Sequence, residues 1–398
     1  MKIYIINEGT CTRVKLYGMD VTNLFKLNNW EIVDKKEDAD YIAINTCSFL
    51  NSKAMYFLNK TRKLYEEKTK KQKLMIIGCL GGTNKEDILN IGKDIIIFKR
   101  DLTEIKDYFK FKKVPDTKST SVEDKLTFKK QILYLFNKYI LKSKHIEYRL
   151  KRNKVCYLQI STGCQGKCSY CSEKFITKLK SRPVEDIIDA IHDGIKRGYR
   201  LFGLNSDDAS AYGKDLNTNL EALLKEVVKI KEDINFSIPE FNPQGLTDNV
   251  VELLKDKKFL YITCPIQSGS NKTLKNMKRP YTIEHALKQL RKVKQNNKNL
   301  MINTHVIVGF PGETEEDFNE TIKALETGLF DRVKVFMYNE RPNTEALKIN
   351  PKISEEEKER RKEIVLDVIK KNNLKKKSLT NLILNREQLK WLNYWTMS

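Results

Sequence analysis

Three closely spaced cysteines have the most evident chemistry in this chain. Cys164, Cys168 and Cys171 follow a Cys-x3-Cys-x2-Cys pattern within residues 161–171. Thiolates at this spacing can hold three irons of a four-iron, four-sulfur cube and leave the fourth iron open. A zinc loop is the alternative, but a structural zinc site is closed by four ligands, and this stretch offers no fourth Cys or His.

An iron without a cysteine ligand is free to bind a cofactor. Such an iron can bind the amino and carboxylate groups of S-adenosylmethionine, the cofactor from which proteins generate a carbon radical. The spacing, with Tyr170 directly before the third cysteine, resembles the radical-SAM superfamily. We therefore expect a [4Fe-4S] cluster, bound S-adenosylmethionine and radical chemistry.

A second set of cysteines is far apart in sequence but shares one position, because each member follows a predicted strand. The three residues are Cys11, Cys47 and Cys79, and the strands cover residues 3–7, 41–45 and 74–77. Parallel strands bring their carboxyl ends to one edge of a sheet, so these thiols can converge into a second three-cysteine iron-sulfur site. Isolated cysteines are otherwise more often small buried hydrophobes.

The remaining cysteines and the histidines are expected to be structural. Cys156 and Cys264 fall inside apolar strands without spacing partners and are interpreted as core residues. The four histidines stand in no motif and are interpreted as structural or surface residues: His145, His192, His285 and His305.

Length and composition limit the class of protein. A chain of 398 residues suggests two or three domains. It contains no run of eighteen apolar residues, and the apolar run at its start is too short for a signal peptide. We therefore expect a cytoplasmic protein without membrane contact. Eight cysteines, six of them in motif-like loops, fit metal ligation in a reducing compartment better than disulfides.

The net charge of +22 is typical of a protein with an anionic partner such as RNA. Residues 101–155 hold fifteen Lys and Arg against seven Asp and Glu. This region can be a solvated connector or a patch that faces the substrate, and the sequence leaves both open.

Two series of alternating strands and helices predict an α/β protein. The first hundred residues predict an N-terminal doubly wound parallel-sheet domain. A second series predicts six β-α units and therefore a partial (β/α)6 barrel, with strands at 155–160, 201–205, 235–238, 261–265, 301–308 and 332–337. Cys164 lies in the loop after the first of these strands, where chemistry gathers in such folds.

This pattern predicts four regions: an N-terminal domain at 1–100, a basic connector at 101–150, the barrel at 151–349 and a helical tail at 350–398. The connector contains an apolar-periodic helix around 126–141, and Ser181 is expected to cap the helix at 183–196. No glycine follows Gly328, so we do not expect a small β-barrel in the tail.

Several motifs together resemble the methylthiotransferase family of radical-SAM enzymes over about residues 1–370. They are Asn45-Thr46-Cys47-Ser48, Ile77-Gly78-Cys79-Leu80, Ser181-Arg182-Pro183, Pro265-Ile266-Gln267-Ser268-Gly269-Ser270, Ile307-Val308-Gly309-Phe310-Pro311-Gly312-Glu313-Thr314 and Glu340-Arg341-Pro342. The resemblance implies transfer of a methylthio group to a tRNA adenosine or to an aspartate of a ribosomal protein. It also implies two [4Fe-4S] clusters, one that cleaves S-adenosylmethionine and one that presents sulfur.

The resemblance also implies contacts to S-adenosylmethionine at the strand ends. Besides Tyr170, the expected contacts are Asn205, Gln267, Ser268, Gly309 and Arg341. Arg341 can pair with a carboxylate of cofactor or substrate, or it can be an exposed arginine at a helix entry. No catalytic residue beyond the cluster ligands is assigned.

Departures from the family pattern bear on the substrate. Val14 stands where the family usually has Asn, Asn343 stands where Gly is usual, and the RNA-binding TRAM barrel is not expected. A peptide or protein side chain is therefore slightly favoured, with C2 of tRNA adenosine-37 as the alternative.

Two further functional classes stay open. One is radical-SAM peptide crosslinking, although no cysteine follows Cys264, and the other is a non-catalytic RNA-binding or scaffold role. An external flavodoxin- or ferredoxin-like donor is expected to supply electrons, and the oligomeric state is left open.

Anaerobic reconstitution should load about eight irons per chain if both cysteine sets hold four-iron clusters. Changing Cys47 to Ala should remove about half of this iron, because one of the two sites then lacks a ligand. Iron and sulfide analysis measures the outcome. A content near four irons that Cys47→Ala leaves unchanged would contradict a two-cluster protein.

Overall fold

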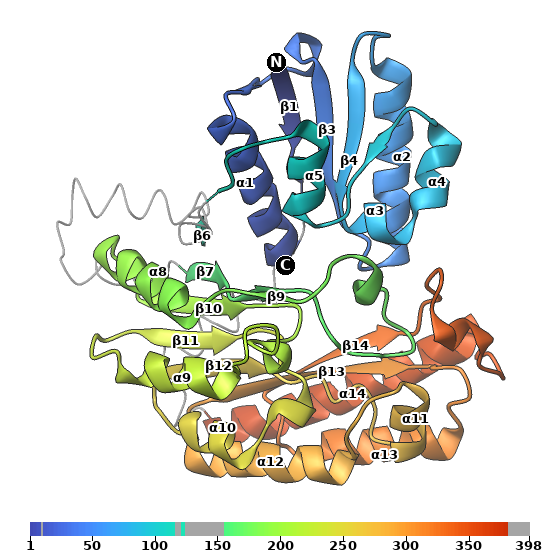
Figure 1. Ribbon diagram of the computed structural model, residues 1–398. Helices are drawn as coiled ribbons and strands as arrows, with labels where there is room; N and C mark the ends of the chain where they lie inside the picture. The colour runs from blue at the N-terminus through green and yellow to red at the C-terminus, as the bar shows by residue number, and fades with distance from the viewer. Residues whose placement is uncertain (9–10, 116–120, 124–154, 381–398) are drawn as a thin grey trace, which may run out of the picture. The chain divides into compact units, whose positions relative to one another are not determined.

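The computed structural model describes residues 1–8, 11–115, 121–123 and 155–380 (Figure 1). The described chain forms two compact units. Unit 1 comprises residues 1–120, 162–180 and 339–347, and unit 2 comprises residues 121–161, 181–338 and 348–398. The expected helix at 126–141, most of the basic connector and the end of the tail lie outside the described residues.

Unit 1 contains a five-stranded sheet in the order β2-β1-β3-β4-β5 whose strands are all parallel. The strands are β1 (Lys2–Ile6), β2 (Glu31–Ile32), β3 (Tyr41–Thr46), β4 (Lys73–Gly78) and β5 (Ile96–Ile97). The helices are α1 (Thr12–Leu27), α2 (Asn51–Glu67), α3 (Cys79–Thr83), α4 (Lys85–Ile91) and α5 (Leu102–Phe109), with 3-10 turns η1 (Lys36–Asp38), η4 (Glu173–Phe175) and η7 (Glu345–Lys348).

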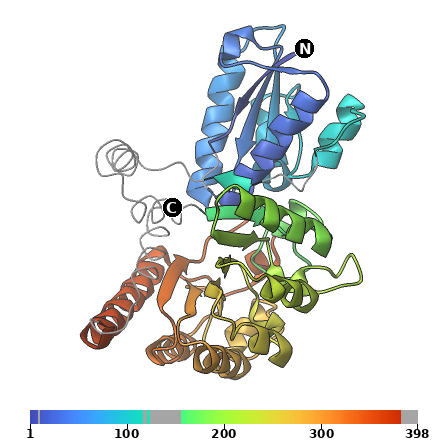
Figure 2. The same cartoon turned by 90° about the vertical axis from the view of Figure 1, so that its left-hand side faces the viewer.

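Helices cover both faces of this sheet, as the sequence predicts for a doubly wound domain (Figure 2). On one face, Phe57 of α2 and Ile88 of α4 pack with Ile44 of β3. On the other face, Phe25 of α1 and Ile105 of α5 pack with the strand residues whose side chains point to that face. Alternate strand residues enter opposite clusters because successive side chains of a strand point to opposite faces.

Unit 2 contains a seven-stranded sheet in the order β14-β13-β12-β11-β10-β7-β6. Six parallel strands confirm the expected β-α series: β7 (Val155–Gln159), β10 (Leu201–Asn205), β11 (Asn235–Ile238), β12 (Phe259–Thr263), β13 (Met301–Val308) and β14 (Arg332–Met337). Strand β6 (Ser121–Glu123) adds an antiparallel edge from the expected connector. Its three residues are too few for a periodic signal, so the sequence did not predict it.

The helices of unit 2 follow the strands as the α/β pattern requires. They are α8 (Val184–Lys196), α9 (Leu220–Lys229), α10 (Asp248–Leu253), α11 (Asn271–Asn276), α12 (Ile283–Asn296), α13 (Glu315–Glu326) and α14 (Glu355–Thr380), with turns η5 (Ala209–Ala211) and η6 (Pro243–Gly245). Polar side chains cap several of them, and Thr314 and Asp317 form a capping box at α13. The expected cap at Ser181 is wrong, because Ser181 lies in β9 (Lys180–Ser181) and Pro183 occupies the cap position.

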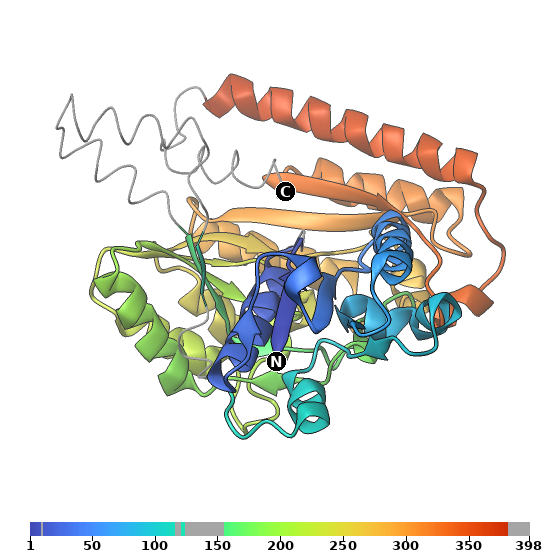
Figure 3. The same ribbon diagram turned by 90° about the horizontal axis from the view of Figure 1, so that it is seen from above.

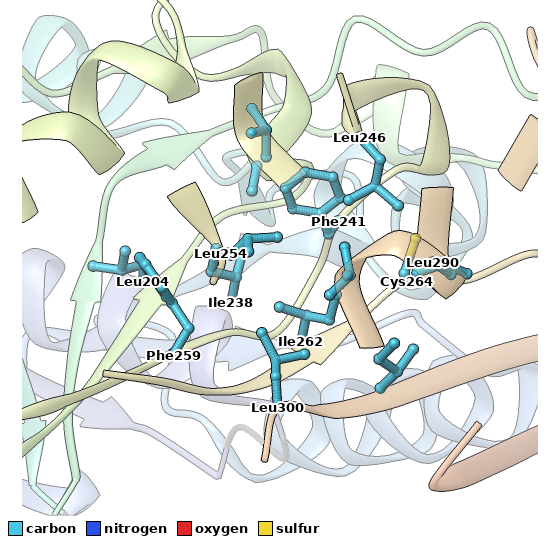
Figure 4. Packing of buried hydrophobic residues seen from close by; sticks show 14 of the residues in the cluster. Leu204, Ile238, Phe241, Leu246, Leu254, Phe259, Ile262, Cys264, Leu290 and Leu300 are labelled. Carbon is cyan, nitrogen blue, oxygen red and sulfur yellow. The ribbon is translucent and has the colours of Figure 1, made fainter. Parts of the chain in front are cut away.

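Apolar side chains of these strands and helices form one large core (Figure 4). Leu204, Ile238 and Ile262 come from neighbouring strands, and Leu290 of α12 belongs to the same core. Cys264 lies in the same core and is fully buried, and burial raises the pKa of its thiol. Among the helices of the described residues, none is long and apolar enough to cross a membrane.

Helix α14 is attached to unit 2 through a buried ion pair. It runs beside β14 and α13 (Figure 3). Arg361 of α14 donates to Glu313 at 2.7 Å, and Glu313 also accepts from the Gly309 backbone at 2.7 Å. The Arg361 and Glu313 side chains are 5% and 0% exposed. Burial raises the pKa of Glu313 although Arg361 and Gly309 act against it.

Arg361→Met should destabilise the protein by about 3–5 kcal/mol, because it leaves the Glu313 carboxylate buried without its partner. Arg360→Met is the matched control. Arg360 is 46% exposed and pairs with Glu315 and Glu357 at the surface, so its loss should cost at most about 1 kcal/mol. Urea unfolding followed by circular dichroism compares the two, and equal midpoints would contradict this role of the buried pair.

Candidate active site

The second cysteine set comes from three neighbouring strands of the unit 1 sheet. Cys11 is the N-cap residue of α1, Cys47 follows β3, and Cys79 begins α3 directly after β4. Residues Thr46 and Gly78 are paired in register, so the next residues, Cys47 and Cys79, leave the sheet side by side. The strand order reverses between β1 and β3, which is where open α/β sheets bind ligands.

The thiols of this set interact with one another. The thiols of Cys47 and Cys11 share a hydrogen bond, which lowers the pKa of Cys11 and raises that of Cys47. Burial raises the pKa of Cys79 to about 12. Metal ligation requires thiolates, so a bound cluster would have to displace protons from Cys47 and Cys79.

The closely spaced set lies in a loop of unit 1 between residues 162 and 180. Backbone N–H groups donate to two of its sulfurs, from Gly166 to Cys164 at 3.2 Å and from Glu173 to Cys171 at 3.4 Å. Hydrogen bonds of this kind stabilise the thiolate form. Burial nevertheless raises the pKa of Cys171 to about 12.

Gly166 makes room for sulfur in this loop. A Cβ atom at Gly166 would lie 3.1 Å from Cys164 Sγ and 3.7 Å from Cys168 Sγ, so a side chain at this position would press against Cys164 Sγ and reach Cys168 Sγ. This close wrapping, together with the backbone donors, fits thiolate ligands of an iron-sulfur cluster.

Neither set is a preformed site for one ion. Among the described residues, no three Cys, His, Asp or Glu side chains are placed so that they could hold a metal ion. A four-iron cube takes one thiolate at each of three irons, so its ligands need not meet at a single point. Both sets have the donor chemistry of cluster ligands.

Four charged residues of unit 1 lie within electrostatic reach of the cysteines. They are Arg13, Arg100, Glu173 and Arg341. The positive charges of Arg13 and Arg100 act to lower the pKa of Cys11 and of Cys79, against burial. Glu173 acts to raise the pKa of Cys79 and of Cys171. One group of charges therefore acts on both cysteine sets.

Sequence reasoning assigned no role to three of these four residues, although each carries a positional signal. Arg13 lies two residues after Cys11, and Glu173 lies two residues after Cys171. Arg100 follows β5, as the cysteines follow β1, β3 and β4. These charged residues share their positions, close to a strand end or to a cysteine, with the cluster cysteines. Only the cysteines, however, have a residue type that indicates metal binding.

Arg341 follows the end of β14 by four residues, as expected, and belongs to unit 1, near Cys47 and Cys171. Its guanidinium donates to the backbone carbonyl of Ser48, next to Cys47. Burial lowers the pKa of Arg341, and nearby Cys171 and Cys47 act to raise it. Tyr170 belongs to the same unit, within the loop of the closely spaced set.

Asn205 ends β10 of unit 2 and is 3% exposed. Its side-chain nitrogen has no hydrogen-bond partner in the described part of the chain, and neither has the buried hydroxyl of Ser206. Buried polar groups are almost always satisfied, so two adjacent orphans indicate a place for a polar ligand. This observation fits the amino-acid part of S-adenosylmethionine.

Gln267, Ser268 and Gly309 shape the neighbouring turns of unit 2. Gln267 has φ of 63° and bridges to β13, where its N–H donates to the His305 carbonyl at 2.9 Å. Ser268 is fully buried, and its hydroxyl contacts Thr321 at 3.2 Å. Gly309 has φ of 70°. The Ser268 side chain is therefore used inside the protein, whereas Gly309 provides the backbone freedom of its turn.

Two protein-family models and several known proteins are similar to this chain. The Radical SAM superfamily model matches residues 158–325, and the model of the Uncharacterized protein family UPF0004 matches residues 2–98. The chain is 30% identical to a ribosomal protein uS12 methylthiotransferase RimO of Nitratiruptor, covering 94% of this chain and 82% of that protein.

Other relatives carry different names. A probable threonylcarbamoyladenosine tRNA methylthiotransferase of Pyrococcus horikoshii is 29% identical, covering 87% of this chain and 79% of that protein. A tRNA-2-methylthio-N(6)-dimethylallyladenosine synthase of Thermotoga petrophila is 30% identical, covering 94% and 83%. Among solved structures, the radical S-adenosylmethionine methyltransferase TsrM of Kitasatospora setae has a similar fold, with a TM-score of 0.60 at 13% identity over 87% of this chain and 76% of that one.

Gly163→Ala should prevent the loop from loading iron. Gly163 has φ of 77°, and a Cβ atom there would collide with the backbone carbonyl of Lys178 across the loop. We expect reconstituted iron to fall from about eight toward about four per chain. Gly198→Ala is the matched control, because Gly198 has φ of 86° but nothing within 4 Å of its Cβ position. Equal iron contents in the two variants would show that the loop tolerates the side chain.

Proposed function

Because the chain belongs to the radical-SAM methylthiotransferase family, we propose that it places a methylthio group at an unactivated C–H bond of a macromolecular substrate. The enzyme class itself follows from the family. The observation that carries the proposal is the presence of both cysteine sets in one compact unit. Two separate sets with cluster chemistry are what sulfur insertion by this family requires.

The cofactors of this family are S-adenosylmethionine and two [4Fe-4S] clusters. When bound, they supply the radical and the sulfur, which side-chain acids and bases do not provide. We assign the first cluster to Cys164, Cys168 and Cys171. The second is assigned to the three cysteines at the strand ends of unit 1: Cys11, Cys47 and Cys79.

The protein's own part is to bind, orient and balance charge. Asn205 and Ser206 are proposed to bind polar groups of S-adenosylmethionine, since their buried polar atoms need partners. Arg341 is proposed to compensate the negative charge of thiolates at Cys47 and Cys171. Tyr170, in the loop of the closely spaced cysteines, and Gly309, in the turn after β13, are proposed to position S-adenosylmethionine. Electrons are proposed to come from an external flavodoxin- or ferredoxin-like donor in the cytoplasm.

For the substrate, we propose a peptide or protein side chain. Relatives that are named for ribosomal protein uS12 support this choice, including proteins of Nitratiruptor and of Alkaliphilus oremlandii at 30% identity. Relatives named for tRNA reach the same identity, so tRNA is the second candidate.

A surface of unit 1 favours the tRNA alternative. Phe49, Met55 and Tyr56 are 52%, 55% and 49% exposed and follow Cys47 within nine residues of sequence. The ammonium groups of Lys53 and Lys60 each lie 6.0 Å from the centre of the Tyr56 ring, and Lys60 and the Tyr56 hydroxyl also pair with Glu8. Exposed rings beside lysines are typical of surfaces that stack bases and neutralise phosphates.

Anaerobic incubation with S-adenosylmethionine and a reductant should convert one substrate pool. The candidates are peptides of ribosomal protein uS12 and bulk tRNA, and mass spectrometry should detect a methylthio group in place of a hydrogen. Cys47→Ala should abolish this product, because the second cluster site then lacks a ligand. A methylthio gain in tRNA alone would replace the peptide proposal, and no gain in either pool would contradict both.

A further inference from the structure

The short helix α3 joins the two cysteine sets within unit 1. It begins at Cys79 and contacts turn η4, which begins two residues after Cys171. A Cβ atom at Gly82 would lie 2.7 Å from the Phe175 carbonyl oxygen and 2.9 Å from Ile176 Cα. These neighbours are backbone atoms, so a side chain at this position would have to push η4 away.

The preceding glycine of the helix lies equally close to a different segment. A Cβ atom at Gly81 would collide with the backbone carbonyl of Phe98, which follows β5. Helix α3 is therefore held between the end of β5 and the loop of the closely spaced cysteines. Both approaches depend on glycine.

An ion pair makes the same connection by a second route. Arg100 follows β5 and pairs with Glu173, the first residue of η4. The two side chains are 3% and 19% exposed. The backbone N–H of Glu173 also donates to Cys171 Sγ at 3.4 Å, so the residue that makes the pair contacts a sulfur of the loop.

Apolar packing adds a third connection. Ile176 is 2% exposed and belongs to the buried cluster that contains Cys47, Cys79 and Leu80. The loop of the closely spaced set is thus anchored to the unit 1 sheet by backbone approach, by charge and by apolar burial. The loop residues that make these three connections all lie within six residues of Cys171 in sequence.

We propose that Gly81, Gly82, Arg100, Glu173 and Ile176 form a joint that sets the spacing between the two clusters. This inference rests on the proposed function, since it assigns a cluster to each cysteine set. The five are positioning residues, because they act through the cysteines and the loop. The sheet of unit 1 would in this way hold the sulfur source at a fixed place relative to the radical source.

The spacing matters for how the radical is used. A misplacement of about 1 Å can lower a rate about 100-fold. Cleavage of S-adenosylmethionine needs one cluster, whereas methylthio transfer needs both. A loosened joint should therefore leave cleavage active while fewer cleavage events end in product.

Glu173→Gln and Gly82→Ala test the joint in the full chain. Both variants should keep about eight irons. The yield of methylthio product per deoxyadenosine formed should fall about tenfold or more, and the magnetic coupling between the reduced clusters in electron paramagnetic resonance should change. In cluster-free protein, amides of residues 162–180 should exchange hydrogen faster than in the unmodified chain. Arg100→Lys, which keeps the charge, should restore part of the yield lost in Arg100→Gln.

Glu345→Gln is the matched control, because Glu345 pairs with Lys174 of the same loop at 3.5 Å but is 46% exposed. It should leave yield, coupling and exchange unchanged. Unchanged yield and coupling in Glu173→Gln would overturn the joint even if Gly82→Ala failed to fold. A content of about four irons in the unmodified protein would instead overturn the two-cluster function. Hydrogen exchange of residues 162–180 in cluster-free protein would still decide whether the joint holds the loop.

Discussion

The ionisation of buried thiols is the main physical constraint on unit 1. Burial opposes ionisation, and it raises the pKa of Cys79 and of Cys171 to about 12. Two features act in the opposite direction: backbone N–H groups that donate to sulfur, and arginines close to the cysteines. A cationic cluster core that bound to these thiols would displace their protons, so metal loading and thiolate formation would be one process.

The parallel sheet of unit 1 explains why distant cysteines can act together. Cys47 and Cys79 leave adjacent strands one residue beyond a registered pair, and Cys11 follows the strand on the other side of β3. The same edge receives Arg100 from β5. A strand edge thus gathers both the proposed ligands and one of the charges that favour their thiolates.

The strand ends of unit 2 carry a different kind of feature. Within the described residues, polar atoms of Asn205 and Ser206 are buried without hydrogen-bond partners, and Glu313 accepts from the backbone of the Gly309 turn. Arg361 of α14 completes that turn from a helix that begins more than forty residues later in the chain. The conformation of the Gly309 turn therefore depends on the buried ion pair, because both share the Glu313 carboxylate.

The α/β fold class and six parallel strands of unit 2 could be predicted from the sequence. Apolar runs of strand length alternate with amphipathic helices, and the expected strands at 201–205, 235–238, 301–308 and 332–337 have the bounds of β10, β11, β13 and β14. Cys164, Cys168 and Cys171 were recognisable because their spacing is local. The position of Cys47 and Cys79 at one edge followed from strand direction alone.

Only the tertiary structure decided which segments join which unit. Residues 162–180 and 339–347 belong to the compact unit of the N-terminal sheet, although they lie between or after strands of the other sheet. Arg341 therefore lies beside Cys47, and Arg100 pairs with Glu173 across 73 positions of sequence. Local spacing and periodicity are written into the order of residues, whereas these contacts depend on side-chain packing between distant segments, which no local pattern records.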